Sequence, residues 1–242
     1  MSEIYGIAGA KQHGKDTLAN YIKQYNDKFE IVHFADELKR LVCIIFNLEL
    51  AQLNESLLKE KLFNNPIVMD NFLDLMKSET GLDIKPQNKI AITPREVMQF
   101  FGTEYVRSEQ DDYWIDFVKR KIDNSIEKNF LISDVRYPNE ANVLRQLGGK
   151  IIKVMRIDMP QNSDVHISER PDLIDADLTL GFITDNFSLH KWSAYLIAHN
   201  MFNTTLTYDY NNYKILINYY SGKNLEYDLD DMFFNSLNFM VE

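Results

Sequence analysis

The sequence is poor in cysteine and in positive charge. Cys43 is the single cysteine among 242 residues, so the chain cannot form an internal disulfide. It lies in the apolar run 41–46, where a thiol usually serves as a small buried hydrophobe in a reducing compartment. Lysine and arginine number 26 against 36 aspartate and glutamate residues, which leaves a net charge of −10. This balance argues against nucleic acid or an anionic membrane as a partner, while a local basic pocket is compatible with it.

Long hydrophobic runs are absent as well. No uncharged stretch of the sequence approaches the roughly 20 residues that a membrane-spanning helix needs, and Met1-Ser2-Glu3 carries no basic segment. We therefore expect a soluble cytoplasmic protein with no membrane partner. His166 and Glu169 have no metal-like spacing with a further histidine or cysteine, which argues against a zinc site. A hydrophobic content of 45% is sufficient for one sizeable core, and we expect a compact α/β unit.

A glycine-containing segment near the N-terminus is the most informative part of the chain. It reads Gly9-Ala10-Lys11-Gln12-His13-Gly14-Lys15-Asp16-Thr17, between an apolar run at 4–8 and an amphipathic run at 18–22. We call residues 9–17 the phosphate loop. A strand that feeds such a turn and then a helix surrounds one point with backbone N–H groups and the positive end of a helix dipole, which suits a polyphosphate.

The phosphate loop predicts a role for each of its distinctive residues. Gly9 and Gly14 permit positive φ and close backbone approach, and Lys15 can reach the outer phosphates of a nucleotide. The usual motif has Ser or Thr directly after the lysine to hold Mg²⁺, but here Asp16 occupies that position and Thr17 follows. The metal could meet the Asp16 carboxylate, the Thr17 hydroxyl or only water. The alternative interpretation of the whole segment is a turn that binds nothing.

Strand and helix patterns alternate after the phosphate loop, which is typical of a parallel sheet with covering helices. The predicted strands are at 4–8, 29–34, 130–134, 150–157 and 177–184, and the predicted helices are at 15–25, after Asp36, after Thr93, at 111–128, after Pro138 and after Asp185-Asn186. Residues 47–92 show helical periodicity broken at Pro66 and Gly81. They are either a helical insertion that contacts a substrate or a structural helical pair that does not.

The residues from about 201 onward are rich in Asn, Tyr and Phe. Within them, residues 208–217 predict a hairpin with Asn211 and Asn212 at its turn. We expect a first domain at 1–200 and a C-terminal extension at 201–242 packed on its core. The extension could cover a sheet edge or form a homodimer contact.

Two short segments add charged candidates. Thr93-Pro94-Arg95-Glu96 predicts a helix start with a capping box. The helix dipole disfavours Arg95 in the first turn, so Arg95 either has a compensating partner such as a phosphate or is a surface arginine. Asp134 ends a predicted central strand and is followed by Arg136 and Glu140. Ligands of parallel sheets bind at this end of the strands, so Arg136 could clamp a phosphate, or it could pair with Asp134 and tie strand to helix.

Two aromatic or polar features are harder to assign. Trp114 is either a core anchor or a face on which a base stacks. Residues 159–171 are polar and non-periodic, which is typical of a mobile flap.

Together these segments resemble the phage-encoded deoxynucleoside monophosphate kinases over most of residues 4–190. The resemblance is carried by the phosphate loop, Thr93-Pro94-Arg95 with Gln99 and Gly102-Thr103, Trp114, Asp134-Val135-Arg136 with Glu140, Arg156, and His166-Ile167-Ser168-Glu169 followed by Asp185-Asn186. It implies a three-layer fold like that of the P-loop NTPases, with a mostly parallel sheet, a helical insertion at about 47–92 and, in this chain, an extra β-rich tail.

The same resemblance implies a reaction and a set of roles. The γ-phosphoryl group of ATP would pass to the 5′-phosphate of a deoxynucleoside monophosphate (dNMP) with the help of Mg²⁺, in the host cytoplasm if a phage encodes the chain. Lys15, Arg136 and Arg156 would assist the transfer, with Arg107 as a weaker candidate. The acceptor pocket would be lined by Lys39, Arg95, Gln99, Gly102, Thr103, Trp114, Asp134, Arg136 and Glu140, and Lys59 or Lys61 could supply a cation from the insertion.

Two other functions fit the same residues. A P-loop kinase of another phosphorylated small metabolite would share Lys15 and Thr17 but would not need Trp114 for stacking. A nucleotide-gated ATPase or binding protein would hydrolyse ATP without a small acceptor.

Overall fold

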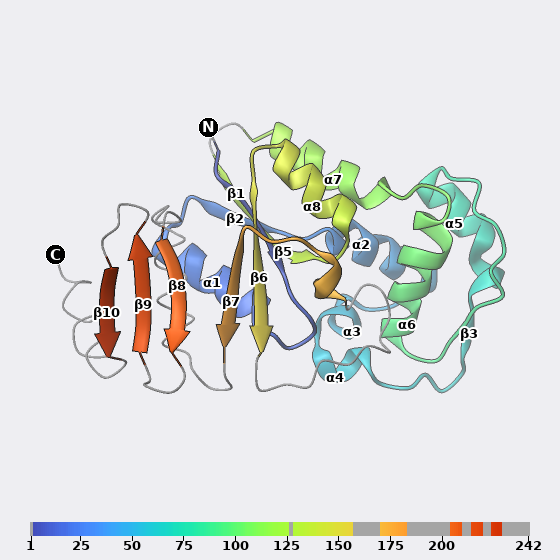
Figure 1. Ribbon diagram of the computed structural model, residues 1–242. Helices are drawn as coiled ribbons and strands as arrows, with labels where there is room; N and C mark the ends of the chain where they lie inside the picture. Colours follow the sequence, from blue (N-terminus) through green and yellow to red (C-terminus); the bar gives the residue numbers. More distant parts are fainter. Residues whose placement is uncertain are drawn as a thin grey trace. The chain divides into compact units, whose positions relative to one another are not determined.

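Figure 1 shows the computed structural model of the protein, which describes residues 2–125, 128–156, 170–182, 204–209, 214–219 and 224–228. The chain divides into two compact units. The first unit combines Met1–Ile31 with Glu127–Glu242, and the second unit is Val32–Ile126. The predicted insertion at 47–92 lies within the second unit, and the predicted domain boundary near residue 200 stays a prediction.

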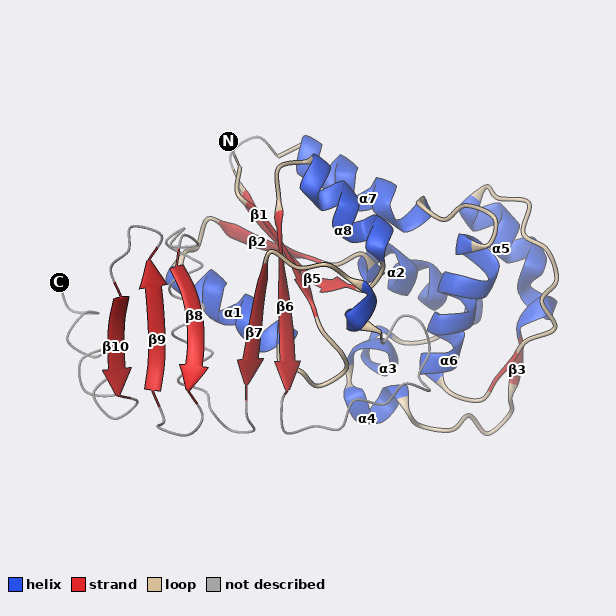
Figure 2. Ribbon diagram, viewed as in Figure 1, coloured by secondary structure: helices blue, strands red, loops and turns tan. Residues whose placement is uncertain are grey.

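A five-stranded sheet forms the centre of the first unit (Figure 2). Its strands are β1 (Ile4–Ala8), β2 (Phe29–Val32), β5 (Asn129–Val135), β6 (Lys150–Arg156) and β7 (Leu178–Phe182), in the order β2-β5-β1-β6-β7. Strand β1 pairs in parallel with β5 and β6, and β6 pairs in parallel with β7. The mostly parallel sheet predicted from the apolar runs is therefore confirmed.

Helices α1 (Lys15–Tyr25) and α8 (Pro138–Gln146) cover this sheet. α1 packs on β1 and β5, and α8 packs on β1 and β6. The connection from β1 to β2 crosses β5, whereas the connection from β5 to β6 crosses β1 in the opposite direction. Because such connections are right-handed, the two helices lie on opposite faces of the sheet, and the unit has three layers.

Strand β1 is buried along its whole length, as expected of the central strand of a doubly covered sheet. Gly6 in its middle permits close packing by α8. A Cβ atom at this position would lie 2.7 Å from Leu144 Cδ1 and 2.8 Å from Ile151 Cδ1. The glycine thus sets how near helix α8 can come to the sheet.

The register between β1 and β5 changes near the carboxyl end of the sheet. Gly6 pairs with Ile132, but Ala8 pairs with Val135, so Ser133 and Asp134 together oppose Ile7. One extra residue on a strand bends it locally and re-aims its side chains. The irregularity falls where the predicted charged segment of β5 begins.

Strands β8 (Thr204–Asp209), β9 (Lys214–Tyr219) and β10 (Asn224–Asp228) form a separate antiparallel sheet. Their alternating directions are visible in Figure 1. The β8–β9 pair confirms the two predicted hairpin strands, while the turn residues Asn211 and Asn212 lie outside the described residues. β10 was not predicted.

The second unit is mainly helical. Its elements are α2 (Ala35–Phe46), α3 (Leu50–Asn54), α4 (Ser56–Lys59), β3 (Ile67–Val68), η1 (Met69–Phe72), α5 (Leu73–Thr80), β4 (Ile90–Ala91), α6 (Pro94–Gln99), η2 (Phe100–Arg107) and α7 (Tyr113–Asp123). β3 and β4 pair antiparallel, a ribbon that periodicity could not predict because two residues per strand show no alternation. Gly81, with φ of 72°, ends α5 as the sequence predicted.

The helix that starts at Thr93 continues through Gly102 and Thr103 as the π-helical segment η2 and ends at Arg107. A Cβ at Gly102 would lie 3.0 Å from Leu38 Cδ2, so the glycine serves close packing on α2 rather than helix termination. π-helical turns are rare and concentrate at functional sites.

The core of the second unit joins α2, α6, η2 and α7. Its buried members are Leu41, Val42, Ile45, Phe46, Leu53, Met69, Met76, Ile84, Ala91, Val97, Phe101, Tyr105, Val106, Tyr113 and Trp114. Cys43 is partly buried against this cluster, and burial raises the pKa of its thiol. Because the thiolate is the reactive form, the structure supports the prediction of a packing role for Cys43.

Three predicted segments lie outside the described residues: the larger part of the flap (159–169), the helix after Asp185-Asn186, and the turn of the tail. Within the described ranges, no helix has the length and hydropathy to cross a bilayer.

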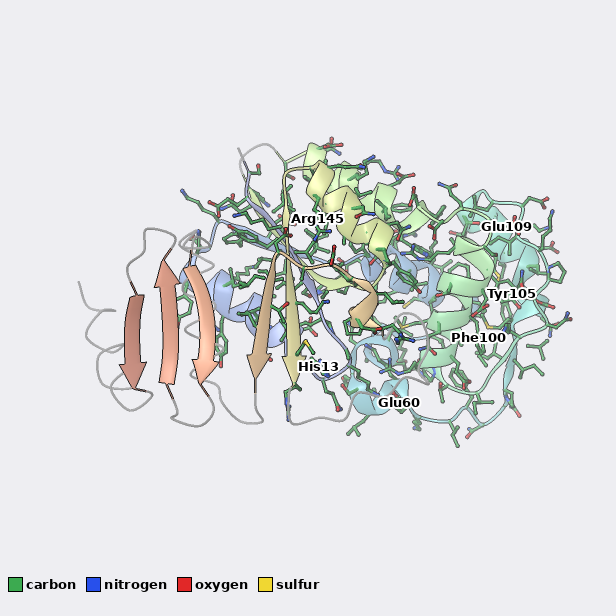
Figure 3. All side chains as sticks on the ribbon, viewed as in Figure 1. His13, Glu60, Phe100, Tyr105, Glu109 and Arg145 are labelled. Atoms are coloured by element: carbon green, nitrogen blue, oxygen red, sulfur yellow. The ribbon has the colours of Figure 1, made fainter. Side chains whose placement is uncertain are left out.

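Asp70 links three segments of the second unit. Its carboxylate accepts hydrogen bonds from the backbone N–H groups of Gln87 (3.1 Å) and Asn88 (3.0 Å) and from the hydroxyl of Tyr105, which is labelled in Figure 3. Burial tends to raise the pKa of Asp70, but the hydrogen bonds from Tyr105 and the two amides outweigh it and lower the pKa. Asn88 has a positive φ of 54°, so this carboxylate holds a strained turn against η2.

We expect Asp70→Asn to destabilise the protein by about 1–2 kcal/mol, because an amide is a weaker acceptor than a carboxylate for three donors. A group whose folded pKa is lowered contributes stability above its ordinary pKa, and this contribution is lost as pH falls through the folded value. The stability of the wild type, measured by urea unfolding, should therefore fall more steeply below about pH 4 than that of Asp70→Asn. Asp74→Asn, on exposed α5 surface, is the matched control. Equal pH slopes for wild type and Asp70→Asn would contradict this role.

Candidate functional site

The phosphate loop leaves the carboxyl end of β1, between the carboxyl ends of β5 and β6. Gly14 is in the left-handed region, with φ of 87° and ψ of 17°, as the sequence predicted. At position 9 a glycine is needed for a different reason, because a Cβ atom there would lie 2.5 Å from the carbonyl oxygen of Val154 on β6. Gln12 also adopts a positive φ, 64°, which the sequence did not indicate. Alternating left-handed residues turn successive amides toward one concavity.

The ammonium group of Lys15 lies within this loop. Lys15 is only 8% exposed, and its Nζ donates a hydrogen bond to the carbonyl oxygen of Ala10 at 2.9 Å. Gly14, at the N-cap of α1, supplies no side-chain oxygen to the first turn of the helix. A helix start without a side-chain cap, beside a lysine, is the arrangement in which proteins bind phosphate.

His13 fastens the loop to the end of β6 (labelled in Figure 3). Its Nδ1 lies 3.4 Å from the carbonyl oxygen of Val154 and 3.4 Å from the backbone nitrogen of Arg156. The ring can donate to the first or accept from the second, depending on its tautomer. In either state His13 is buried and ties the phosphate loop to the end of β6 at Val154 and Arg156, the arginine predicted to screen charge.

Strand β5 brings two buried polar residues to the same edge. The Ser133 hydroxyl donates to Asp16 Oδ1 at 2.9 Å, and Ser133 is fully buried. Asp134 follows it and is also buried. Sequence reasoning missed Ser133, although a serine inside an apolar strand signals a buried hydroxyl that needs a partner.

Glu140 shapes the turn that presents Arg136. Its Oε2 accepts hydrogen bonds from the backbone N–H groups of Arg136 (2.7 Å) and Tyr137 (3.1 Å), and the residue is only 2% exposed. The carboxylate therefore closes the N-terminus of α8, where Pro138 occupies N1 as predicted. Its proposed contact with substrate stays a prediction.

The first unit thus gathers at one sheet edge the phosphate loop, the segment from Ser133 to Arg136, and the end of β6 with Arg156. Among these residues, Asp16, Thr17 and Asp134 have side-chain oxygen atoms of the kind that bind a divalent cation. Among the residues that the structure describes, no three His, Cys, Asp or Glu side chains cluster as metal ligands.

In the second unit, Thr93 caps the predicted helix, but the capping box is only half formed. The Thr93 side chain accepts from the Glu96 backbone N–H at 3.2 Å. Glu96 Oε2 accepts from the backbone N–H of Ile92, the residue before the N-cap, at 2.7 Å, and not from that of Thr93. Arg95 Nε donates to Glu60 Oε1 at 2.6 Å. The partner that its position in the first turn demands is thus supplied by a carboxylate on the residue after α4, and its contact with an acceptor phosphate stays a prediction.

Trp114 is an anchor of the second unit's core. It is 3% exposed, its Nε1 donates to the Gly102 carbonyl oxygen at 3.0 Å, and its ring meets Phe101 and Tyr113 edge to face. These contacts leave little ring surface for a base, so stacking on Trp114 stays a prediction without structural support. Thr103 lies in η2.

The other predicted residues of this unit are on helices. Lys39 is half-buried on α2, and Gln99 is the last residue of α6. Arg107 is buried and donates to the Asp111 carbonyl oxygen at 2.9 Å, which gives it a structural role at the end of η2.

The sheet order, the glycine-bounded loop and the buried Lys15 define a class: an α/β protein with a P-loop kinase-like fold. A family model described as deoxynucleotide monophosphate kinase matches residues 69–192, so the chain belongs to that family. A protein of Acanthamoeba polyphaga mimivirus named "Putative deoxynucleotide monophosphate kinase" is 27% identical over 180 residues, which cover 69% of this chain and 80% of that protein. The family resemblance drawn from the motifs is therefore confirmed.

Proposed function

We propose that the protein transfers the γ-phosphoryl group of ATP to the 5′-phosphate of a dNMP and releases the corresponding diphosphate. The observation that carries the proposal is the phosphate loop, with Gly14 and Gln12 in the left-handed region and Lys15 buried beside them. Membership of the deoxynucleotide monophosphate kinase family supports the acceptor class. Phosphoryl transfer requires positioning and charge neutralisation more than covalent chemistry, and these residues can supply both.

The donor would lie on the phosphate loop. Backbone N–H groups of residues 12–17 would bind its β- and γ-phosphates, and the Lys15 ammonium would leave the Ala10 carbonyl oxygen for a phosphate oxygen. The exchange is favourable because a phosphate carries full negative charge whereas a carbonyl carries only a partial one.

A divalent cation fits the donor set at this edge. Asp16, Thr17 and Asp134 are the side chains that would hold Mg²⁺, directly or through water, and Mg²⁺ in such sites is bound by one or two carboxylates together with substrate phosphates. When bound, Mg²⁺ neutralises charge on the transferred group. Buried Ser133 already orients the Asp16 carboxylate.

Arginine side chains would handle the remaining charge. Arg136 follows the buried Asp134, and its backbone is fixed by Glu140; its guanidinium would take the acceptor phosphate. Arg156, at the end of β6, would screen charge in the transition state. The acceptor phosphate is already an anion, so the reaction needs no general base.

One observation favours a second candidate, a kinase of another phosphorylated small metabolite. Trp114 is buried in the core of the second unit, so it does not require a nucleobase as its partner. The loop, Lys15 and Arg136 would act in the same way on such an acceptor.

An acceptor screen tests the proposal. The protein is incubated with ATP and Mg²⁺ and with each of the four common dNMPs, the ribonucleoside monophosphates, phosphorylated metabolites that have no base, or no acceptor. We expect nucleoside diphosphate to form with dNMPs well above the no-acceptor rate. ATP hydrolysis that no acceptor changes would overturn the proposal in favour of an ATPase, and turnover confined to acceptors without a base would favour the second candidate.

Lys15→Ala should lower turnover by about a thousandfold, because it removes the side-chain cation on the donor phosphates. The far-ultraviolet circular dichroism spectrum should not change. Lys23→Ala, on the exposed last turn of the same helix, is the control and should keep wild-type turnover. If Lys15→Ala retained near-full activity, the donor assignment would be wrong.

Arg136→Ala should raise the KM for the dNMP and also lower kcat, since the guanidinium would contact the acceptor phosphate in both ground and transition states. The KM for ATP should change little. Arg145→Ala is a useful comparison, because Arg145 binds the Asp175 carbonyl oxygen (3.0 Å) and should affect stability alone. An Arg136→Ala protein that unfolds would instead support the structural ion-pair interpretation.

A further inference from the structure

Ser133 is a buried polar side chain within an otherwise apolar strand. It is fully buried between Ile132 and Asp134 on β5. Its hydroxyl donates to Asp16 Oδ1 at 2.9 Å, across 117 positions of sequence. A buried hydroxyl bonded to a charged acceptor makes a strong and directional contact. The bond therefore fixes one carboxylate oxygen of the residue that follows the phosphate-loop lysine.

The Ser133–Asp16 pair differs from the residues that usually serve Mg²⁺ in P-loop proteins. In P-loop nucleotide-binding proteins, the residue after the lysine supplies a hydroxyl and a strand-end residue supplies a carboxylate, and both serve Mg²⁺. Here the loop supplies the carboxylate of Asp16 and the neighbouring strand supplies the hydroxyl of Ser133. The loop also carries the Thr17 hydroxyl and the strand end also carries the Asp134 carboxylate, so the Ser133–Asp16 pair is an addition to the usual groups. We propose that Ser133 is a positioning residue that holds the Asp16 carboxylate toward the divalent cation of a bound nucleotide. The proposal rests on the proposed donor function of the phosphate loop.

The register of the sheet explains how β5 accommodates this arrangement. In a regular strand, successive side chains point to opposite faces. Opposite Ile7, however, β5 carries both Ser133 and Asp134, and the extra residue bends the strand at that point. Ser133 and Asp134 are both buried there, as are the residues of β5 before them, and Ser133 bonds to Asp16 of α1.

A purely structural role is the competing explanation. An acidic residue in the first turn of α1 is favourable with the helix dipole, and Ser133 would then only satisfy its own hydroxyl. This explanation predicts a change in stability without a change in metal affinity. The positioning role predicts that removal of the Ser133 hydroxyl lowers the affinity for the divalent cation, and that this loss requires Asp16.

The test measures Mn²⁺ binding to the complex with ADP by electron paramagnetic resonance, together with the melting temperature. Ser133→Ala should lower the affinity for Mn²⁺ about tenfold, which is the loss typical of a residue that orients a metal ligand. Asp16→Asn should weaken it at least as much, and Ser133→Ala should have little further effect in the Asp16→Asn background. Ser108→Ala, which removes an exposed hydroxyl of the second unit, is the control and should not change Mn²⁺ affinity.

The proposal would be overturned if Ser133→Ala lowered the Mn²⁺ affinity equally in the wild-type and Asp16→Asn backgrounds. It would also be overturned if a folded Ser133→Ala protein kept the wild-type Mn²⁺ affinity.

The same measurements separate the two proposals, because they use no acceptor. Unchanged Mn²⁺ affinity in Ser133→Ala alongside dNMP turnover by the wild type would remove the positioning role and keep the function. The expected coupling without dNMP turnover would do the reverse. A wild-type chain that binds neither ADP nor Mn²⁺ would overturn both.

Discussion

The close approach of the phosphate loop to strand β6 is the constraint on which the candidate site depends. Gly9 lies so near Val154 that a Cβ atom would stand 2.5 Å from its carbonyl oxygen, and His13 contacts the same oxygen from four residues later. The loop is thus attached to β6 at two points. Between and beyond them, Gln12 and Gly14 take up the left-handed conformation that gathers the amides. A larger residue at position 9 would move the loop, and Lys15 with it.

This attachment exists only because of the sheet order. β1 lies between β5 and β6, although more than 100 residues separate it from either strand. The connections from β1 to β2 and from β5 to β6 run in opposite directions across the sheet. Ligands of such sheets bind at the carboxyl ends of the strands where this reversal occurs, which here is at β1. The same order brings Ser133 to Asp16 and brings the backbone of Arg156 to His13. Local sequence therefore makes the loop, and topology provides its neighbours.

The sequence predicted what is local and periodic. The bounds of β1 and α1, the Pro138 start of α8 and the Thr93 cap of α6 follow from short-range patterns, and the structure has them. It did not predict the β3–β4 ribbon, the π-helical continuation past Gly102 or strand β10, because these depend on packing and pairing with distant segments. The same limit holds for the site: Lys15 was evident from its motif, but the partners of Ser133 and Arg95 were not. A hydrogen bond between side chains far apart in sequence leaves no periodic trace.

The two helices that begin at the carboxyl edge of the sheet treat their N-termini differently. α8 satisfies its start with its own carboxylate, since Glu140 accepts from the amides of Arg136 and Tyr137. α1 begins at Gly14, which has no side chain to offer, and the carboxylate in its first turn, that of Asp16, accepts a hydrogen bond from Ser133 on β5. The start of α8 is therefore capped by a carboxylate of the same helix, whereas the start of α1 has no side-chain cap, which is the arrangement that suits a bound phosphate.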